Sequence, residues 1–227
     1  MDVRVLKRVL KRVLRIIIPS RLIKQMVSFK ALAFEYGQFR TISKWDCIDK
    51  ACNEIPWYTY PAIEYLNNIN FSDKVVFEYG SGNSSIYWGR RAKEVISVED
   101  DKGWYDKVKI NLGGNQKLLL KKKNSEYENA ILNFGKKFDV IVIDGIRRVE
   151  CARVISKVLN FDAPDGCMVI LDIRDELDLI EIDFHGFGPI NSYTWTTSLF
   201  LSRNFNFQAI DSIQPNFSIS AIRNNRE

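Results

Sequence analysis

The spacing of apolar residues changes near residue 70 of this 227-residue chain. Before that point apolar positions recur with a helical period; after it, short β-branched runs alternate with helix-like stretches, as in βαβ units. The expected strands are 74–78, 94–98, 117–121, 139–143 and 167–172, and the expected helices are 84–92, 102–112, 125–134 and 149–159. This alternation predicts an α/β fold with helices on both faces of a mostly parallel, Rossmann-like sheet.

Both ends of the chain depart from that alternation. Three runs after residue 172, at 179–184, 194–202 and 217–222, predict strands that end the sheet in antiparallel pieces. Residues 20–34 predict a helix, and 43–70 a helical region interrupted by aromatic residues. The chain therefore divides into a basic amphipathic helix (1–19), a helical extension or lid (20–72) and a sheet domain (73–227).

The first helix concentrates the positive charge. Residues 1–24 carry eight Lys or Arg against one Asp, a net charge of +7, so the +5 of the whole chain leaves −2 for the rest. A nucleic-acid partner is not expected, because the folded domain itself is not basic. Apolar residues fill one half of the helical wheel and basic residues the other, which favours residues 1–18 lying on an anionic membrane surface.

Other interpretations of this helix stay open. Its apolar side could pack on the domain or on a partner helix in an oligomer, and a mitochondrial presequence is also basic and amphipathic. A secretory signal is excluded by the basic residues at every turn. The four cysteines form no CxxC pair, so no metal site is expected, and they indicate a reducing, cytoplasmic compartment.

The segment VVFEYGSGNSS carries the most informative motif. An apolar strand ends at Glu78, and the chain turns through Gly80 and Gly82 into a helix near Ser85. Glycines allow a tight turn and a close approach of the backbone to a ligand, which the amide groups at the helix start would face. Glu78 would repel a pyrophosphate but suits the ammonium group of an amino-acid-like ligand.

Two further acidic segments are expected at the same edge of the sheet. Glu99 ends the second strand, 21 residues after Glu78, about where an acidic residue takes the ribose hydroxyls of a nucleoside. The strand FDVIVIDG delivers Asp144. Simpler explanations remain: the glycines could only make a turn, Glu99 could cap a helix as Asp100 or Asp101 could, and Asp144 could hold a loop through an arginine.

These three segments, in this order, resemble the class I S-adenosylmethionine (SAM)-dependent methyltransferases. The resemblance covers about residues 74–172. It implies SAM as cofactor, with Glu78 at its methionine part and Glu99 at its ribose. The residues that it places against the cofactor are Glu78, Gly80, Gly82, Ser85, Glu99, Asp100, Asn124 and Asp144, with the adenine near Asp100 and Asn124.

A hydroxyl acceptor gains from a positioned base. The candidates are Asp144, Asp172 at the end of the fifth strand, and His185, the only histidine, in a segment expected to form a shaped loop. Tyr58 and Tyr60, beside Trp57, are expected either to contact substrate in a lid or to attach the amino-terminal helices to the core.

Segments outside the motifs resemble bacterial methyltransferases associated with surface-glycan synthesis. That resemblance implies O-methylation of a sugar or lipid-linked glycan by a cytoplasmic protein, with a peripheral position on the inner face of the membrane as an option. Two alternatives remain: a related SAM-fold transferase such as an aminopropyltransferase, and a non-catalytic, membrane-attached SAM-binding or scaffold protein. The sequence leaves the acceptor, the methylated atom and the oligomeric state open.

Overall fold

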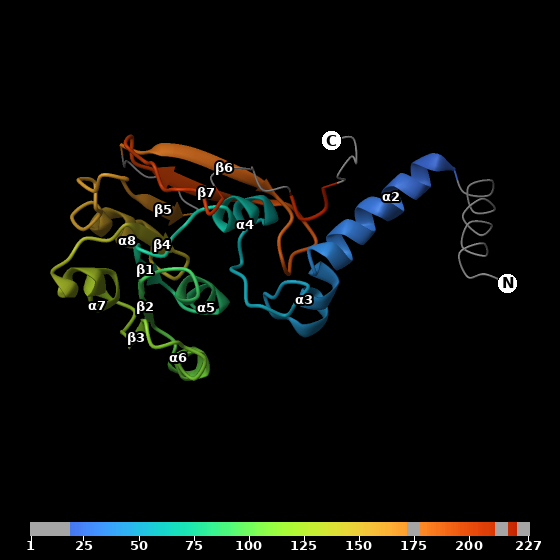
Figure 1. Ribbon diagram of the computed structural model, residues 1–227. Helices are drawn as coiled ribbons and strands as arrows, with labels where there is room; N and C mark the ends of the chain where they lie inside the picture. The colour runs from blue at the N-terminus through green and yellow to red at the C-terminus, as the bar shows by residue number, and fades with distance from the viewer. Residues whose placement is uncertain (1–18, 172–177, 212–217, 222–227) are drawn as a thin grey trace.

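A computed structural model describes residues 19–171, 178–211 and 218–221 (Figure 1). Its centre is a seven-stranded sheet of order β3-β2-β1-β4-β5-β7-β6. The strands are β1 (Val75–Tyr79), β2 (Glu94–Glu99), β3 (Gln116–Leu120), β4 (Val140–Ile143), β5 (Met168–Leu171), β6 (Ile180–Gly186) and β7 (Trp195–Leu201). The first five strands run parallel, and β7 runs antiparallel to both β5 and β6. The expected Rossmann-like fold with an antiparallel carboxyl-terminal end is confirmed.

Helices and helical turns connect the strands and form the amino-terminal extension. They are α2 (Ser20–Lys30), the π-helix η1 (Ala31–Glu35), α3 (Gln38–Lys44), α4 (Tyr60–Asn67), α5 (Asn83–Gly89), α6 (Lys102–Lys109), α7 (Ser125–Glu128), the 3-10 helix η2 (Asn129–Phe134) and α8 (Arg148–Ile155). Within the described ranges, no helix combines the length and apolar character needed to cross a bilayer. The helix expected over residues 1–18 lies outside the described residues.

Two hydrophobic cores fill the two faces of the sheet. On one face, α4 and α5 pack through buried side chains that include Leu66 and Trp88. On the other face, η2 and α8 pack through residues that include Ile131 and Ile155. Because side chains alternate along a strand, β1 sends Val76 into the first core and Phe77 into the second. Glu78 consequently lies on the α4 and α5 face.

The region 43–70 is less helical than its pattern predicts. Between α3 and α4 the chain is irregular and contains a tight loop in which Asp49 Oδ1 accepts hydrogen bonds from the amides of Ala51 and Asn53. Trp45 and Cys52 adopt positive φ angles of 52° and 69°, a conformation that an α-helix excludes. Local side-chain bonding to the backbone has replaced helix formation here.

Two predictions near the carboxyl terminus also need correction. The segment expected to form a loop around His185 is the end of β6, where His185 pairs with Thr196 of β7. Residues 218–221, expected within a strand, instead form a turn in which the amide of Ala221 donates to the carbonyl of Ser218. At His185, pairing with a distant strand decides the structure, and periodicity alone does not report such pairing.

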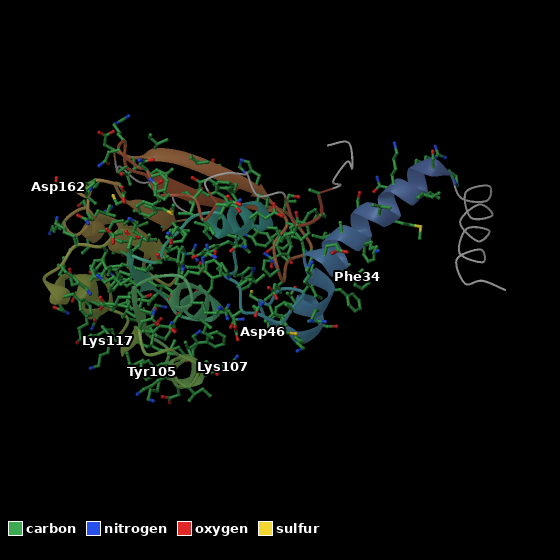
Figure 2. The ribbon with its side chains drawn as sticks, in the orientation of Figure 1. Phe34, Asp46, Tyr105, Lys107, Lys117 and Asp162 are labelled. Carbon is green, nitrogen blue, oxygen red and sulfur yellow. The ribbon has the colours of Figure 1, made fainter. Side chains whose placement is uncertain are left out.

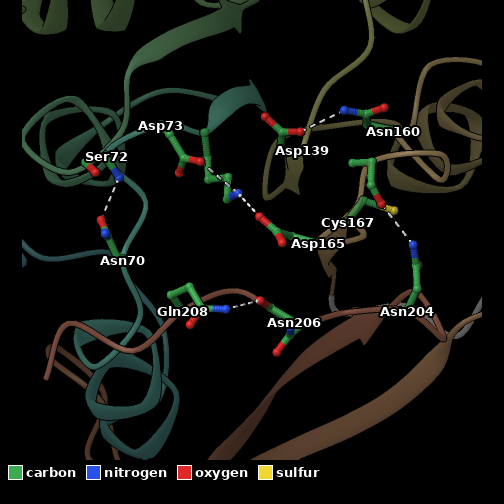
Figure 3. Close-up of polar contacts among 12 residues, drawn as sticks. Asn70, Ser72, Asp73, Asp139, Asn160, Asp165, Cys167, Asn204, Asn206 and Gln208 are labelled. Atoms are coloured by element: carbon green, nitrogen blue, oxygen red, sulfur yellow. Dashed lines mark hydrogen bonds and ion pairs between the residues drawn. The ribbon is translucent and has the colours of Figure 1, made fainter. Parts of the chain in front are cut away.

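A polar cluster stabilises the amino-terminal edge of the parallel strands (Figure 3). Lys74 is 7% exposed, and its Nζ lies 2.9 Å from Asp165 Oδ2 and 3.1 Å from Asp73 Oδ2. Asn160 Nδ2 donates to Asp139 Oδ1, and Asp139 Oδ2 accepts from the amide of Val75. These contacts tie the start of β1 to the loops before β4 and β5, at the edge opposite the site described next.

Candidate functional site

The strand order reverses between β1 and β4, and the loops that follow these two strands touch. Gly80 follows β1 with a φ of +93°, and a Cβ there would lie 3.0 Å from the amide nitrogen of Gly145, which follows β4. A Cβ on Gly145 would collide with the hydroxyl of Tyr127. Glycine is therefore required at both positions, and the two loops frame a site at the switch point where open α/β folds bind ligands.

Glu78 is a buried carboxylate at this point, 1% exposed. Its Oε2 accepts hydrogen bonds from Ser85 Oγ at 2.5 Å and Ser97 Oγ at 2.7 Å. Its Oε1 is buried and has no hydrogen-bond partner among the described residues. Burial raises the pKa of Glu78, an effect that the nearby serine hydroxyls oppose. A buried acceptor without a donor is a place where a ligand donor would bind.

Glu99 at the end of β2 is held by the loops that follow β2 and β1. Its Oε1 accepts from the amides of Asp100 and Asp101 at 2.9 and 3.1 Å, and its Oε2 accepts from Ser81 Oγ at 2.7 Å. Asp101 caps α6 by accepting from the amide of Trp104, so the capping role considered for Glu99 belongs to Asp101.

A cavity of about 330 Å³ opens between these loops. Its lining is mostly acidic and glycine-rich, and comprises Glu78, Gly80, Ser81, Ser84, Glu99, Asp100, Trp104, Asp144, Gly145 and Ile146. Carboxylates from three strand ends thus face one cavity. The arrangement suits a ligand with an ammonium group and several hydroxyls, and it is unfavourable for a phosphate.

A second cavity of about 280 Å³ adjoins the first. It is lined by Trp45, Asp46, Cys47, Trp57, Ser81, Gly82, Asn83, Ser84, Trp104, Lys107, Asp144 and Ile190. Ser81, Ser84, Trp104 and Asp144 line both cavities. Asp46 on the extension and Lys107 on α6, both labelled in Figure 2, line this second cavity. The second cavity therefore lies between the sheet domain and the amino-terminal extension.

Asn83 ties the extension to the start of α5. Its Nδ2 donates to Asp46 Oδ1 and to the carbonyl of Cys47, both at 2.7 Å. Burial, together with the charges of Asp46 and Asp144, raises the pKa of the Cys47 thiol to about 12. The thiol stays protonated at neutral pH, so Cys47 contributes a wall and no nucleophile.

The structure brings most of the expected cofactor residues together. Glu78, Gly80, Glu99, Asp100 and Asp144 line the first cavity, and Gly82 lines the second. Asp144 also binds Arg148, whose Nη2 lies 3.1 Å from its Oδ1. The loop-holding role considered for Asp144 is therefore present together with its exposure to both cavities.

Ser85 and Asn124 have other partners. Ser85 is fully buried behind Glu78, where its hydroxyl accepts from the amide of Gly82 and donates to the carboxylate. Ser85 thus positions Glu78 and does not line the first cavity. Asn124 Oδ1 accepts from the amide of Glu126 and caps α7, and Asn124 is not among the cavity residues.

Tyr58, Tyr60 and His185, expected to act on the substrate, line neither cavity. Tyr58 and Tyr60 are buried in the first core, Tyr60 against Tyr36 with ring centroids 4.7 Å apart, which favours the attachment role over a lid contact. His185 Nδ1 lies 2.7 Å from Thr196 Oγ1 on β7, and His185 lines neither cavity. Asp172 lies outside the described residues.

Sequence reasoning missed several residues of the site. Trp45 and Trp104 form walls of the second cavity, and Trp104 Nε1 donates to the carbonyl of Ser81. Asp46 is held at the site by the hydrogen bond that Asn83 Nδ2 donates to its Oδ1. Trp104, five residues beyond Glu99, was within reach of a spacing argument, but Trp45 and Asp46 lie in an irregular segment without a periodic pattern.

Fold and cavities together describe a Rossmann-like α/β protein with a candidate ligand site at its switch point. No protein-family model matches the sequence, and no curated protein matches it significantly. Solved structures with a similar fold include an rRNA methylase from Streptococcus thermophilus, 14% identical, with a TM-score of 0.47 over 63% of this chain and 97% of that one. Another is the O-methyltransferase TomG from Streptomyces achromogenes in complex with SAM, 12% identical, with a TM-score of 0.46 over 63% and 78%. These likenesses are too distant to assign an activity, so the functional argument rests on this chain's own residues.

Proposed function

We propose that the chain is a SAM-dependent methyltransferase that uses the first cavity for its cofactor. The observation that carries the proposal is the pair Glu78 and Glu99, two buried carboxylates on neighbouring strands that line one cavity beside the Gly80 turn. The cofactor has an ammonium group at one end and ribose hydroxyls toward the other, and both kinds of group are donors to carboxylates.

The residues present fit this cofactor. Glu78 Oε1 is a buried acceptor without a donor, and an ammonium would satisfy it with a charge-assisted hydrogen bond. Gly80 and Gly145 keep the cavity floor free of side chains. Glu99 would bind the ribose hydroxyls, with its Oε2 exchanging the Ser81 hydroxyl for them. Asp100 would lie beside the adenine.

When bound, SAM supplies a methyl group already activated on a sulfonium, so the protein mainly has to align the acceptor. The second cavity is the acceptor site in this proposal, because it shares four residues with the first. Asp144 lines both cavities, and its carboxylate would accept the proton that an acceptor hydroxyl loses. Arg148 keeps Asp144 in place through their ion pair.

The acceptor we favour is a sugar or a lipid-linked glycan, methylated on oxygen. Trp45, Trp57 and Trp104 offer flat apolar surfaces to a sugar ring, and the side-chain oxygens of Asp46 and Asn83 are acceptors for its hydroxyls. A lipid-linked acceptor would sit at the inner face of the cytoplasmic membrane, where the basic helix over residues 1–18 would hold the enzyme.

A calorimetric titration with SAM, S-adenosylhomocysteine and NAD tests the cofactor proposal. We expect binding of SAM and S-adenosylhomocysteine, and we expect Glu99→Ala to weaken SAM by about 1–3 kcal/mol, because a charged acceptor of two hydroxyls is lost. Glu94→Ala is the matched control, since Glu94 begins the same strand at the opposite edge and pairs with Lys136. Binding of NAD without SAM, or equal losses in both variants, would contradict the proposal.

A methyl-release assay then separates an enzyme from a SAM-binding scaffold. The second candidate is an aminopropyl-type transferase, which the carboxylates Asp46 and Asp144 beside aromatic walls favour. It is tested with a panel of amines and decarboxylated SAM as donor, by following transfer of the aminopropyl group to the amine and release of methylthioadenosine. Turnover with saccharide acceptors supports O-methylation of a glycan, and turnover confined to amines excludes it.

A further inference from the structure

Helix α2 (Ser20–Lys30) has almost no packing partner within the described chain. None of its residues is buried, and Figure 1 shows it projecting away from the sheet domain. A helix of 11 residues is marginal in water by itself, and most helical stability in proteins comes from packing of an apolar face. We therefore expect the exposed face of α2 to pack against a partner surface.

That face carries a continuous apolar stripe. Leu22, Met26 and Phe29 are 50%, 60% and 65% exposed, and their spacing of four and three residues puts them on one side of the helix. With Gln25 they line an open hollow of about 520 Å³. Large apolar side chains gathered in this way mark an interaction site more often than scattered exposed residues do.

The stripe leads into a second hollow with a basic rim. Ala33 lies one turn beyond Phe29 and, with Phe34 and Phe39, forms the apolar part of a cavity of about 340 Å³. The Phe34 and Phe39 rings are 6.0 Å apart, and Figure 2 marks Phe34 where α2 meets the rest of the extension. The remaining lining is polar or basic and consists of Gly37, Arg40, Ser43, Lys44 and Lys50.

The charge of this surface distinguishes two possible partners, a second copy of the chain and an anionic bilayer. Residues 19–34 contain Arg21, Lys24 and Lys30 and no acidic residue, and the carboxylate of Glu35, next to Phe34, pairs with Lys50 at 3.6 Å. A second copy would bring the same positive charge against this face, which is unfavourable. An anionic bilayer offers both apolar depth and negative charge.

We propose that the α2–α3 surface, made of Leu22, Met26, Phe29, Phe34 and Phe39 with the basic residues around them, docks on an anionic lipid bilayer. Apolar side chains enter the boundary between headgroups and acyl chains, and the lysines and arginines contact anionic headgroups. This surface is separate from residues 1–18, and the inference does not rest on the proposed methyltransferase activity.

Co-sedimentation of the full chain with vesicles tests the proposal. We expect binding to vesicles of phosphatidylcholine with phosphatidylglycerol, little binding to phosphatidylcholine alone, and weakening by salt. The combined variant Leu22→Ser, Met26→Ser, Phe29→Ser is expected to bind about tenfold more weakly or worse. Ile110→Ser is the matched control, because Ile110 is 81% exposed but lies at the end of α6.

A charge variant gives an independent measurement. Lys24→Gln with Lys44→Gln is expected to lower binding by about tenfold or more, since each basic residue near an anionic surface contributes about fivefold. Lys93→Gln with Lys109→Gln, which removes equal charge elsewhere, is expected to have a much smaller effect. The unfolding midpoint and far-ultraviolet circular dichroism should match the unmodified chain, because none of these side chains is buried.

Two results would overturn the proposal. The first is unchanged vesicle binding in the serine variant, which would assign all membrane contact to residues 1–18. The second is a dimer, seen by sedimentation equilibrium, that the serine variant dissociates while its vesicle binding stays the same; the α2 stripe would then be an interface between copies.

Discussion

Glu78 and Glu99 are both glutamates, but they differ in whether both carboxylate oxygens accept hydrogen bonds. Glu99 Oε1 accepts hydrogen bonds from the loop after β2, and its Oε2 accepts one from Ser81 in the loop after β1. One oxygen of Glu78 accepts two hydrogen bonds, and the other accepts none from the described residues. Burial of an unsatisfied carboxylate disfavours its charged form. The protein without ligand therefore holds a group whose ionisation works against folding.

The pH dependence of stability follows from the raised pKa of Glu78. A carboxyl group that binds its proton more tightly in the folded state destabilises the fold as pH rises from its ordinary pKa, about 4.3, through its raised folded pKa. Glu78→Gln lacks this titration. We expect the variant to gain stability relative to the unmodified protein as pH rises, measured by urea unfolding across that range.

Repeating the unfolding measurement with SAM present is the control for this prediction. If an ammonium binds Glu78, SAM should remove most of the relative destabilisation of the unmodified protein and should bind Glu78→Gln at least about tenfold more weakly. A stability difference that does not change with pH would contradict the assignment of the raised pKa to this residue.

At the residue scale, spacing predicted the acidic residues of the site and failed for the aromatic ones. Glu78, Glu99 and Asp144 follow apolar strands, and parallel topology brings their strand ends to one edge. Trp45 belongs to no periodic element, so only the folded chain places it. Ser85 was expected to contact cofactor because it replaces a motif glycine, but its hydroxyl turns inward to Glu78.

At the element scale, the site depends on the close approach of the loops after β1 and β4. Gly145→Ala would place a methyl group against the hydroxyl of the buried Tyr127 side chain and the Gly80 backbone. We expect a loss of about 1–3 kcal/mol in the free energy of unfolding, as for overpacking of a rigid interior, together with weaker SAM binding. Denaturant unfolding and calorimetry measure the two effects.

Gly114→Ala is the matched control for this substitution. Nothing lies within 4 Å of the position that its Cβ would take, and its φ is not positive. It should change stability by less than about 0.5 kcal/mol. Equal effects of the two alanine substitutions would refute the requirement for glycine at position 145.

The parallel strands matched their predicted positions within about a residue or two, and in β1, β2, β4 and β5 buried runs that contain β-branched residues have few alternatives. Elements held by distant partners were less predictable. The segment 125–134 was expected to be one helix and is a short α7 followed by the 3-10 helix η2. The end of β6 was expected to be a loop, since its polar, exposed edge position hides the pairing with β7.

At the scale of the whole molecule, stability and ligand chemistry lie at opposite edges of the parallel strands. Burial lowers the pKa of Lys74, but its ion pairs with Asp165 and Asp73 outweigh that effect and raise it. Lys74→Met should cost about 1–2 kcal/mol, because both carboxylates keep access to water. That corresponds to a fall in Tm of about 2–8 °C for a domain of this size.

The same variant should leave SAM affinity unchanged, because Lys74 lies at the amino-terminal edge and lines neither cavity. Differential scanning calorimetry and titration of one preparation test both statements. A parallel loss of affinity would indicate that the two edges are mechanically coupled.

The four residues common to both cavities have a thermodynamic consequence. A molecule in one cavity that contacts these residues also changes a wall of the other, so we expect the two binding equilibria to be coupled, and each occupant then changes the affinity of its neighbour by the same factor. A search for acceptors made without the nucleoside present would therefore probe an incomplete surface. Compounds that bind only as the third member of a ternary complex would be missed.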